Sequence, residues 1–523
     1  MNKNKEKNNR ENGGSKPPFQ TGVIDIGAHM VRMDVYELDR SWQPEKLESM
    51  SRPFNLGADV FRNGYVPVEN IVKLVETVDK YRKKIEEYDT DNYRIIATSA
   101  VREAYNKELI VDRFRDAGMN LEILEGSTEA TLSYLAVRDT LPEKFSFALG
   151  NAVVLIMGSG SLFVIGVSCG LMRFCEEMPT GTLRMNDTLG SSEPPLDDIR
   201  QLLKSQRISR RLEESMQLTS DTPVSLVLVG NSARKLAALA DSAPESENAW
   251  VKLNIKEFSR ILEDCENGSK KLLKKIDPDE VLELSGAAVI VRHFFNTLLC
   301  KDIFCPGMTT RGAVLRDRVR QLRSPGVDPF RADLAAVCAS IGRKYDFDEQ
   351  HARNVAAASS LIFNKLRAIQ SFPEHSGLLL EAASYLHDIG RFIDARRHQR
   401  HSWYLITHTE LPGLTASEQR IVAAAVRFHG KTLPRDSHPE YAALSADEKV
   451  AVLKLAAVLR VADALDLRTG DTFPEMKVVL RGRTLNLITD VPELNARRNT
   501  LKIKGGLFEQ VFGLELKLLN GEL

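Results

Sequence analysis

The sequence lacks several features that would assign it to a class at once. No run approaches the ~20 apolar residues of a membrane-spanning helix, and the polar N-terminus has no apolar signal core. The formal net charge is +0, which excludes a long-range attraction to nucleic acid or to an anionic membrane. The 6 cysteines form neither a CxxC pair nor a dense framework, which excludes a disulfide scaffold and a zinc ribbon. We therefore expect a cytoplasmic protein whose anion sites are local patches.

Hydrophobic patterning divides the chain into several parts. Residues 1–18 are polar and predict a disordered tail. Residues 21–38 and 153–166 each have the pattern strand, glycine turn, strand, which predicts a duplicated α/β domain made of residues 19–150 and 151–325. Residues 326–470 are rich in Ala and Leu at helical spacing and predict an all-α domain. The alternating residues of 471–523 predict a small α/β or β appendage.

Glycine turns and the segments beside them follow one another in a particular order. They are VIDIG (23–27), ATSAVREA (97–104), LEGSTEATLSYLAV (124–137), MGSGSLFVIG (157–166), MPTGTLR (178–184) and VGNSARKLAAL (229–239). Such turns let backbone N–H groups converge on a phosphate, while carboxylates hold Mg²⁺ or orient an attacking water. As an ordered set, these segments resemble the exopolyphosphatase/guanosine pentaphosphatase (Ppx/GppA) family. That resemblance implies an actin-like (ASKHA, ribonuclease H-like) fold for the duplicated α/β part.

The resemblance also implies roles for individual residues of a phosphate cleft. Asp25 and Glu129 stand at the family's first-loop aspartate and catalytic glutamate, so both are candidate catalytic residues. The candidate phosphate-binding residues are two arginines and the residues of two turns: Arg32, Arg102, Gly27, Gly158, Ser159, Gly160 and Ser161. The implied ligands are polyphosphate or a guanosine nucleotide, and the family further implies a homodimer.

This cleft departs from the family pattern at its metal and proton-transfer positions. Leu155 stands where the family has a metal-binding aspartate, and Leu162 stands where it has a second catalytic glutamate. A leucine neither ligates Mg²⁺ nor accepts a proton, so ordinary hydrolysis in this cleft should be severely impaired. Polar or glycine residues are also replaced in two other turns, by Ala28, His29 and Met30 and by Asn231, Ser232 and Ala233.

The sharpest local motif is LHDIG at residues 386–390, which follows an amphipathic helical run. We expect Gly390 to end that helix, with His387 and Asp388 near its C-terminus. An adjacent His and Asp hold one metal ion together, and the carboxylate can bridge to a second ion. The motif resembles the HD superfamily of metal-dependent phosphohydrolases, in which an upstream His and a later Asp complete the ligand set. His351 and Asp463 fit those two positions.

Members of that superfamily with two metals add two histidines between the His-Asp pair and the last aspartate. His401 and His429 fit these positions, with His398 as the alternative to His401. Imidazole and carboxylate ligands suit Mg, Mn, Fe or Zn. Nearby arginines either grip further phosphates or form a solvated basic loop: Arg391, Arg396, Arg397 and Arg400.

Three functions are compatible with these observations. The first is a phosphohydrolase that acts on polyphosphate or guanosine alarmones in the phosphate cleft. The second is a metallohydrolase that works at the HD-type site, with the phosphate cleft as a sensor. The third is a non-catalytic, regulatory protein that binds polyphosphate or an alarmone. We expect metal-dependent hydrolysis at the HD-type site, since leucines replace two carboxylates of the phosphate cleft.

Overall fold

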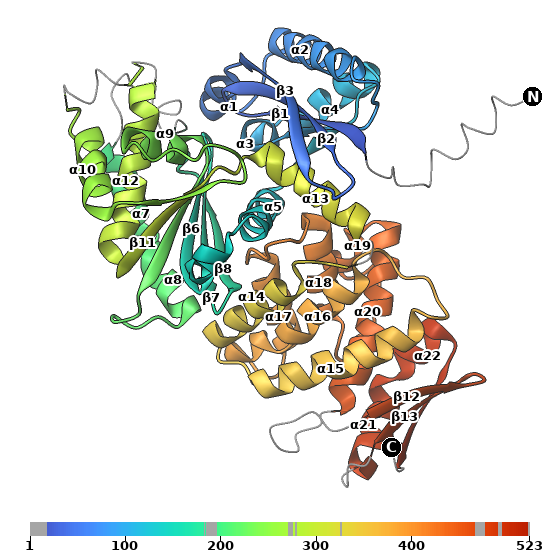
Figure 1. The fold of residues 1–523 in the computed structure, drawn as a ribbon. Helices are drawn as coiled ribbons and strands as arrows, with labels where there is room; N and C mark the ends of the chain where they lie inside the picture. Colours follow the sequence, from blue (N-terminus) through green and yellow to red (C-terminus); the bar gives the residue numbers. More distant parts are fainter. Residues whose placement is uncertain are drawn as a thin grey trace, which may run out of the picture. The chain divides into compact units, whose positions relative to one another are not determined.

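This computed structural model describes residues 18–182, 184, 196–269, 276, 277, 280–324, 327–465, 476–489 and 494–520. The predicted tail and the predicted boundary at 470/471 therefore lie outside the described residues, apart from residue 18. The chain forms two compact units, residues 1–170 with 175–329 and residues 171–174 with 330–523 (Figure 1). Each unit is described by itself below.

The first unit opens with a five-stranded sheet in the order β3-β2-β1-β4-β5. Its strands are β1 (Phe19–Ile26), β2 (Met30–Leu38), β3 (Pro44–Pro53), β4 (Tyr93–Ala97) and β5 (Leu121–Ile123). The strands β1, β2 and β3 pair antiparallel, whereas β4 and β5 continue from β1 in parallel. The accompanying helices are α1 (Leu56–Asn63), α2 (Val68–Glu86), α3 (Ser99–Glu103), α4 (Lys107–Asp116) and α5 (Gly126–Asp139).

A second sheet in the same unit has the order β10-β11-β9-β6-β7-β8. Its strands are β6 (Asn151–Met157), β7 (Leu162–Ser168), β8 (Leu171–Met178), β9 (Val224–Val229), β10 (Trp250–Leu253) and β11 (Cys300–Pro306). The helices around it are η1 (Glu143–Leu149), α7 (Leu196–Ser205), α8 (Ile208–Met216), α9 (Asn231–Leu239), α10 (Ile255–Glu266) and α12 (Val281–Thr297), whereas α13 (Thr310–Arg323) packs against β1 and α5. The run β8-β7-β6-β9-β11 repeats the order of the first sheet, with an antiparallel β6–β7 pair and parallel β9 and β11. The predicted duplication of an α/β domain is therefore present.

The second unit is mainly helical. Its helices are α14 (Arg331–Lys344), α15 (Glu349–Leu366), α16 (Ser376–Leu386), η3 (Ile389–Phe392), α17 (His398–Thr407), α18 (Ala416–Arg427), α19 (Pro439–Ala442) and α20 (Ala446–Leu465). The sequence of α20 is apolar almost all round, and accordingly most of its residues are buried. This central helix contacts α15, α16 and α18, so its side chains can meet those of several neighbours at one point.

The end of the chain differs in part from the prediction. A three-stranded sheet in the order β12-β13-β14 contains β12 (Met476–Arg481), β13 (Thr484–Thr489) and β14 (Glu515–Asn520). Residues 501–512, expected to be strand-like, instead belong to α21 (Leu494–Lys504) and α22 (Gly506–Phe512). The buried side chains of Leu501, Phe508 and Phe512 recur at helical spacing, and this period overrides the local alternation.

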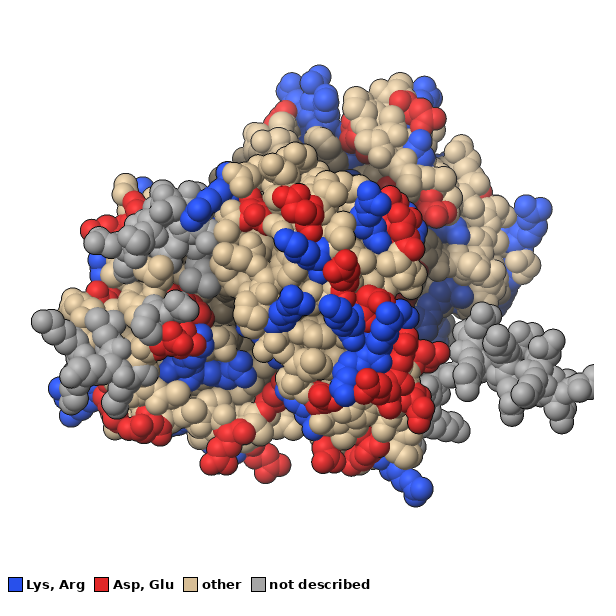
Figure 2. Space-filling view, turned by 90° about the horizontal axis from the view of Figure 1, so that it is seen from above, with Lys and Arg blue, Asp and Glu red and all other residues tan. Residues whose placement is uncertain are grey.

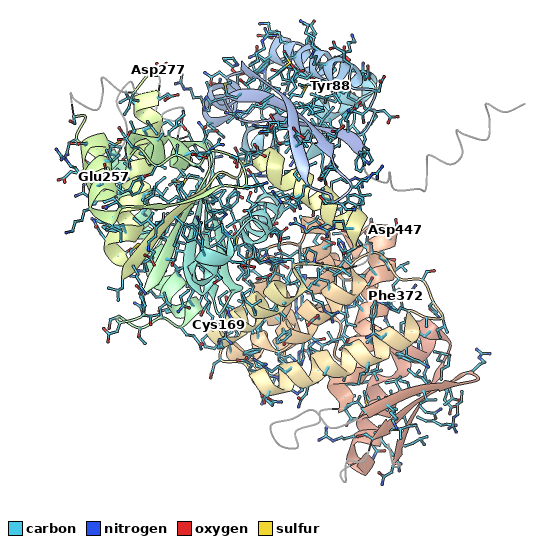
Figure 3. The ribbon with its side chains drawn as sticks, viewed as in Figure 1. Tyr88, Cys169, Glu257, Asp277, Phe372 and Asp447 are labelled. Atoms are coloured by element: carbon cyan, nitrogen blue, oxygen red, sulfur yellow. The ribbon has the colours of Figure 1, made fainter. Side chains whose placement is uncertain are left out.

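The distribution of charge and the state of the cysteines agree with the composition. On the face drawn in Figure 2, basic and acidic side chains are interspersed, as the zero net charge suggests. The six cysteines are all free, and Cys169 lies exposed in the turn between β7 and β8 (Figure 3). Among the described residues, no helix combines the length and the apolar character that crossing a bilayer would demand.

Candidate metal centre

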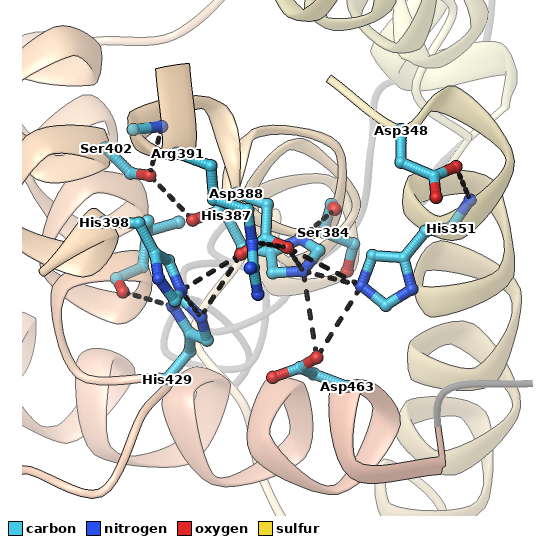
Figure 4. Close-up of polar contacts among 12 residues, drawn as sticks. Asp348, His351, Ser384, His387, Asp388, Arg391, His398, Ser402, His429 and Asp463 are labelled. Atoms are coloured by element: carbon cyan, nitrogen blue, oxygen red, sulfur yellow. Dashed lines mark hydrogen bonds and ion pairs between the residues drawn. The ribbon is translucent and has the colours of Figure 1, made fainter. Parts of the chain in front are cut away.

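Six histidine and aspartate side chains of the second unit converge on one buried point (Figure 4). His351 comes from the first turn of α15, and His387 and Asp388 directly follow α16. His398 begins α17, His429 follows the end of α18, and Asp463 lies near the end of α20. Elements distant in sequence therefore bring these candidate ligands together.

Local interactions fix the elements that carry these side chains. Asp348 caps α15 by accepting a hydrogen bond from the His351 backbone N–H at 2.9 Å, which sets where that histidine lies in the first turn. Ser402 Oγ accepts from the Gly390 N–H at 2.9 Å and donates to the His387 carbonyl at 2.7 Å. This serine, which the sequence did not single out, ties the turn after α16 to α17.

Gly390 has a different role from the one predicted. The helix α16 ends at Leu386, four residues earlier, and Gly390 lies in the short helix η3. A Cβ atom at this position would lie 2.3 Å from both the His398 carbonyl oxygen and the Ser402 nitrogen. Glycine is therefore required because the backbone of this turn lies against the start of α17.

Three of the histidines have the same hydrogen-bonding arrangement. The Nδ1 atoms of His387, His398 and His429 lie 2.8, 3.0 and 2.6 Å from backbone carbonyl oxygens three residues earlier. A carbonyl oxygen only accepts, so each Nδ1 carries the hydrogen, and in a neutral ring Nε2 is then a bare lone pair. Since metal-ligating histidines are typically oriented in this way, the Nε2 atoms are the candidate donors.

The Nε2 atoms of the four histidines lie in two close pairs. His398 Nε2 and His429 Nε2 lie 3.3 Å apart, and His351 Nε2 and His387 Nε2 lie 3.2 Å apart. Burial lowers the pKa of His429 to about 3, so this ring is neutral at pH 7. With the His398 ring in its neutral form as well, the His398–His429 contact has no hydrogen to share, and a cation between the rings would satisfy both nitrogens.

Asp388 lies between the two histidine pairs. Its Oδ1 is 3.1 Å from His398 Nε2 and 3.9 Å from His429 Nε2, while Oδ2 is 3.6 Å from His387 Nε2 and 3.9 Å from His351 Nε2. Asp463 Oδ1 lies on the side of the second pair, 3.7 Å from His351 Nε2. The donor set thus fits two neighbouring cations that share the Asp388 carboxylate.

The carboxylates of this cluster favour their charged forms. Burial by itself would raise the pKa of Asp388, but the His387 imidazole, the nearby His398 ring and the Arg391 guanidinium outweigh burial and lower this pKa. Arg391 Nε donates to Asp388 Oδ2 at 2.6 Å. The other arginines of that loop, Arg396, Arg397 and Arg400, are exposed.

One predicted ligand is replaced by its alternative. Among the described residues, every group of candidate ligands leaves out His401, whereas His398 joins Asp388 and His429. The reason is where α17 begins. His398 is its first residue, and His401 lies one helical turn later, with its Cβ beside Gly390.

The candidate phosphate cleft of the first unit is occupied by its own side chains. Arg102 donates to Glu129 Oε2 at 3.1 Å and to Glu177 Oε1 at 2.6 Å. Ser161 Oγ donates to the same Glu177 oxygen at 2.7 Å. A Cβ on Gly126, the first residue of α5, would lie 1.8 Å from Glu177 Oε2, so this carboxylate lies at the start of that helix. Glu177 thus occupies the kind of position that a bound anion takes.

Sequence patterns gave no signal for Glu177, because its role depends on contacts with residues 16 or more positions away. Its neighbour Glu129 behaves as expected for a buried carboxyl. Burial raises the pKa of Glu129 to about 7, and Arg102 only partly opposes the effect.

Asp25 lies deeper in the first unit. Its Oδ2 is 3.4 Å from Arg311 Nη1, and Arg311 Nε also donates to Asp34 Oδ2 at 2.6 Å. Burial raises the pKa of Asp25. Arg32 pairs in register with Asp25 across the β1–β2 hairpin, whose turn is closed by a hydrogen bond from the Gly27 N–H to the Met30 carbonyl. Arg311 is thus a further partner that the sequence did not suggest.

The second turn of the cleft is packed against protein. Leu155 and Leu162 are fully buried in the sheet. The Gly158 carbonyl accepts from the Thr182 N–H, and the Ser159 carbonyl accepts from the Arg184 N–H, each at 3.0 Å. Beside Gly160 the backbone of Gly181 approaches so closely that a Cβ on Gly181 would be 2.2 Å from the Gly160 carbonyl carbon. The predicted phosphate-binding turn therefore contacts the segment that follows β8.

Comparison with known proteins places these observations in context. The family model for the Ppx/GppA phosphatase family matches residues 39–321, and the model for Ppx/GppA phosphatase, domain III, matches residues 335–500. Exopolyphosphatase 1 of Mycobacterium tuberculosis is 24% identical over 306 residues, which is 57% of this chain and 88% of that protein. The guanosine-5'-triphosphate,3'-diphosphate pyrophosphatase of Vibrio parahaemolyticus is 23% identical over 499 residues, which is 92% of this chain and 94% of that protein. The crystal structure of an exopolyphosphatase from Cytophaga hutchinsonii covers 58% of this chain and 98% of its own, with 18% identity and a TM-score of 0.48.

Proposed function

Because this chain belongs to the Ppx/GppA phosphatase family, we propose that it is a phosphohydrolase that acts on polyphosphate or a guanosine alarmone, with its metal-dependent chemistry at the HD-type cluster. The ligands we propose are His351, His387, Asp388, His398, His429 and Asp463. His398 takes the place first given to His401. A homodimer remains a prediction from the family.

One observation carries this proposal. The His398 and His429 rings face each other through Nε2 atoms 3.3 Å apart, while both Nδ1 atoms are engaged with carbonyl oxygens. Two lone pairs at that distance beside a carboxylate are unfavourable in a protein interior without an ion, but they suit the binding of a cation.

The residues of the cluster have distinct tasks in the proposed reaction. Divalent ions, when bound, supply Lewis acidity toward a phosphoryl oxygen and toward water. Asp388 presents one carboxylate oxygen to each histidine pair and so would hold the two cation positions in register. Arg391, half exposed and fixed by Asp388, is placed to pair with phosphate oxygens of a substrate.

The choice of substrate class rests on the relatives and on charge. The similar proteins are an exopolyphosphatase and a guanosine-5'-triphosphate,3'-diphosphate pyrophosphatase, both of which act on chains of phosphate groups. The exposed arginines Arg396 and Arg397 lie on the loop that leads from Asp388 to His398, and the exposed Arg400 lies in the first turn of α17. These cations would favour a substrate with several phosphates over a monoester.

The first unit is assigned a supporting role. Its candidate catalytic Glu129 is paired with Arg102, and leucines stand at two positions where the family has carboxylates. Without those groups, charge compensation for phosphoryl transfer is weak. We therefore place turnover in the second unit.

The test compares two variants of the full chain. Phosphate release from polyphosphate, pppGpp and ppGpp is measured with added Mn²⁺, together with the metal content of the purified proteins. The His387→Ala/Asp388→Ala variant should lose both metal and turnover, whereas Glu129→Gln should keep both. Loss of turnover only in Glu129→Gln would move the chemistry to the first unit and refute the proposal.

A third result would favour the non-catalytic alternative. If the wild type releases no phosphate from any of these compounds but binds one of them, it is a regulatory binding protein. The leucines at positions 155 and 162, which neither hold an ion nor transfer a proton, are the observation that favours this outcome.

A further inference from the structure

Lys504 reaches the metal centre from the end of the chain. It is the last residue of α21, a helix that packs on α20 together with α22. Its Nζ donates a hydrogen bond to Asp463 Oδ2. About a fifth of the lysine side chain is exposed, so the contact lies at the edge of the buried cluster.

The two oxygens of Asp463 face different partners. Asp463 Oδ1 lies 3.7 Å from His351 Nε2 and 4.0 Å from His387 Nε2. Asp463 Oδ2 is the oxygen that Lys504 holds. The lysine thus binds the outer oxygen and leaves the inner one directed at the imidazoles.

We propose that Lys504 is a positioning residue of the metal centre, which orients Asp463 so that one carboxylate oxygen faces the cation. This inference rests on the proposed function. Hydrogen-bond partners of ligating carboxylates fix the direction of the ligand, and their loss typically weakens metal binding about 10–100-fold. The C-terminal segment would thereby complete a site whose other residues come from the helices before it.

The other carboxylate also has a basic partner, which contacts the oxygen that faces His387 and His351. Arg391 Nε donates to Asp388 Oδ2 at 2.6 Å, so each candidate carboxylate ligand has one basic partner. A lysine in the last turn of a helix is also favourable for the helix dipole. Lys502 meets that need equally well, yet its side chain is exposed, and only Lys504 reaches the cluster.

The experiment is a Mn²⁺ titration of the full chain after removal of metal by a chelator, followed by electron paramagnetic resonance of the free ion. Lys504→Ala should bind Mn²⁺ about 10–100-fold more weakly than the wild type. Lys504→Arg should recover most of the affinity, because it restores a donor to Asp463. Lys502→Ala, on the same helix, is the matched control and should bind like the wild type.

Lys504→Met keeps the aliphatic stem and serves if the alanine variant does not fold, as judged by its thermal transition without metal. Equal affinity in the wild type and in the folded Lys504 variants would overturn the inference while the proposed function stands. Tighter binding by these variants would also overturn it, since the ammonium would then be a competitor of the ion. A wild type that binds no Mn²⁺ would overturn the proposed metal centre itself, and the role of Lys504 with it.

Discussion

The two acidic clusters of this chain are balanced in opposite ways. In the first unit, Glu129 and Glu177 share the guanidinium of Arg102, and Asp25 lies beside Arg311. In the second unit, the inward oxygens of the carboxylates face imidazole nitrogens that also carry lone pairs. Arg391 and Lys504 also pair with the carboxylates of the second cluster, so the difference lies in the imidazole Nε2 atoms gathered there, which the first cluster lacks and which a metal ion would satisfy. This difference distinguishes a cleft whose charges are paired within the protein from a site that we propose to hold metal ions.

The strongest way to break this contrast is to alter the carboxylate shared by both histidine pairs. Asp388→Asn should lose both metal equivalents and turnover, whereas Asp463→Asn should lose mainly the ion held near His351. Metal content by mass spectrometry and phosphate release are the measurements. Equal losses in the two variants would mean that Asp388 is not shared.

Substitution at the two competing histidines should have the next largest effect. His398→Ala should remove one ion and with it several kcal/mol of charge stabilisation in the transition state, because it deletes an Nε2 donor beside Asp388. His401→Ala, three residues further along α17, should retain both ions. Metal stoichiometry and turnover are compared, and the reverse result would restore His401 as the ligand.

The dependence of stability on pH should distinguish the two clusters, because Glu129 of the first unit titrates near neutral pH. Its pKa in the folded protein is about 7, above its ordinary value, so the native state holds the proton more tightly than the unfolded state. This contribution to stability is full below about pH 4.5 and is lost as the pH rises through 7. A shift of that size corresponds to about 3 kcal/mol.

Glu129→Gln should therefore gain stability relative to the wild type between pH 5 and pH 8, as followed by the thermal transition at each pH. The Gln side chain has no proton to lose over this range. Parallel curves for the two proteins would show that the carboxyl is not raised by burial.

The smallest expected effect concerns Glu177. Glu177→Gln removes one negative charge from Arg102, so tripolyphosphate should bind the first unit a few-fold more tightly, a gain of about 1 kcal/mol or less. Glu176→Gln is the matched control, since the carboxylate of Glu176 pairs with Arg211 and not with Arg102. Calorimetric titration of both variants decides whether Glu177 competes with an anion.

Much of the architecture could be predicted from the sequence, because periodicity records which face of an element is buried. The hairpins at 21–38 and 153–166 showed the duplication in advance, and the helical part was visible from its spacing. Residues 501–512 were misjudged because short alternating stretches fit both a strand and a helix until the buried positions are known. Gly390 was given the wrong role because a close approach of two backbones leaves no local pattern.

The candidate site was predictable to the extent that its residues lie in a known motif. His387 and Asp388 stood in LHDIG, and His351, His429 and Asp463 followed from order along the chain. The choice between His398 and His401 depended on where α17 begins, which the basic residues around them did not reveal. Glu177 and Lys504 were missed because each takes part through long-range contacts with residues that nothing in the sequence links to it.

Gly390 has a consequence for the metal centre. Because Gly390 has no Cβ atom, the turn that bears His387 and Asp388 lies within contact distance of the start of α17, the helix that bears His398. The spacing between the two proposed cation positions therefore depends on the absence of a side chain at Gly390. A Cβ atom at this position would push the turn away from α17 and so separate the two proposed cation positions, whose chemistry depends on their closeness.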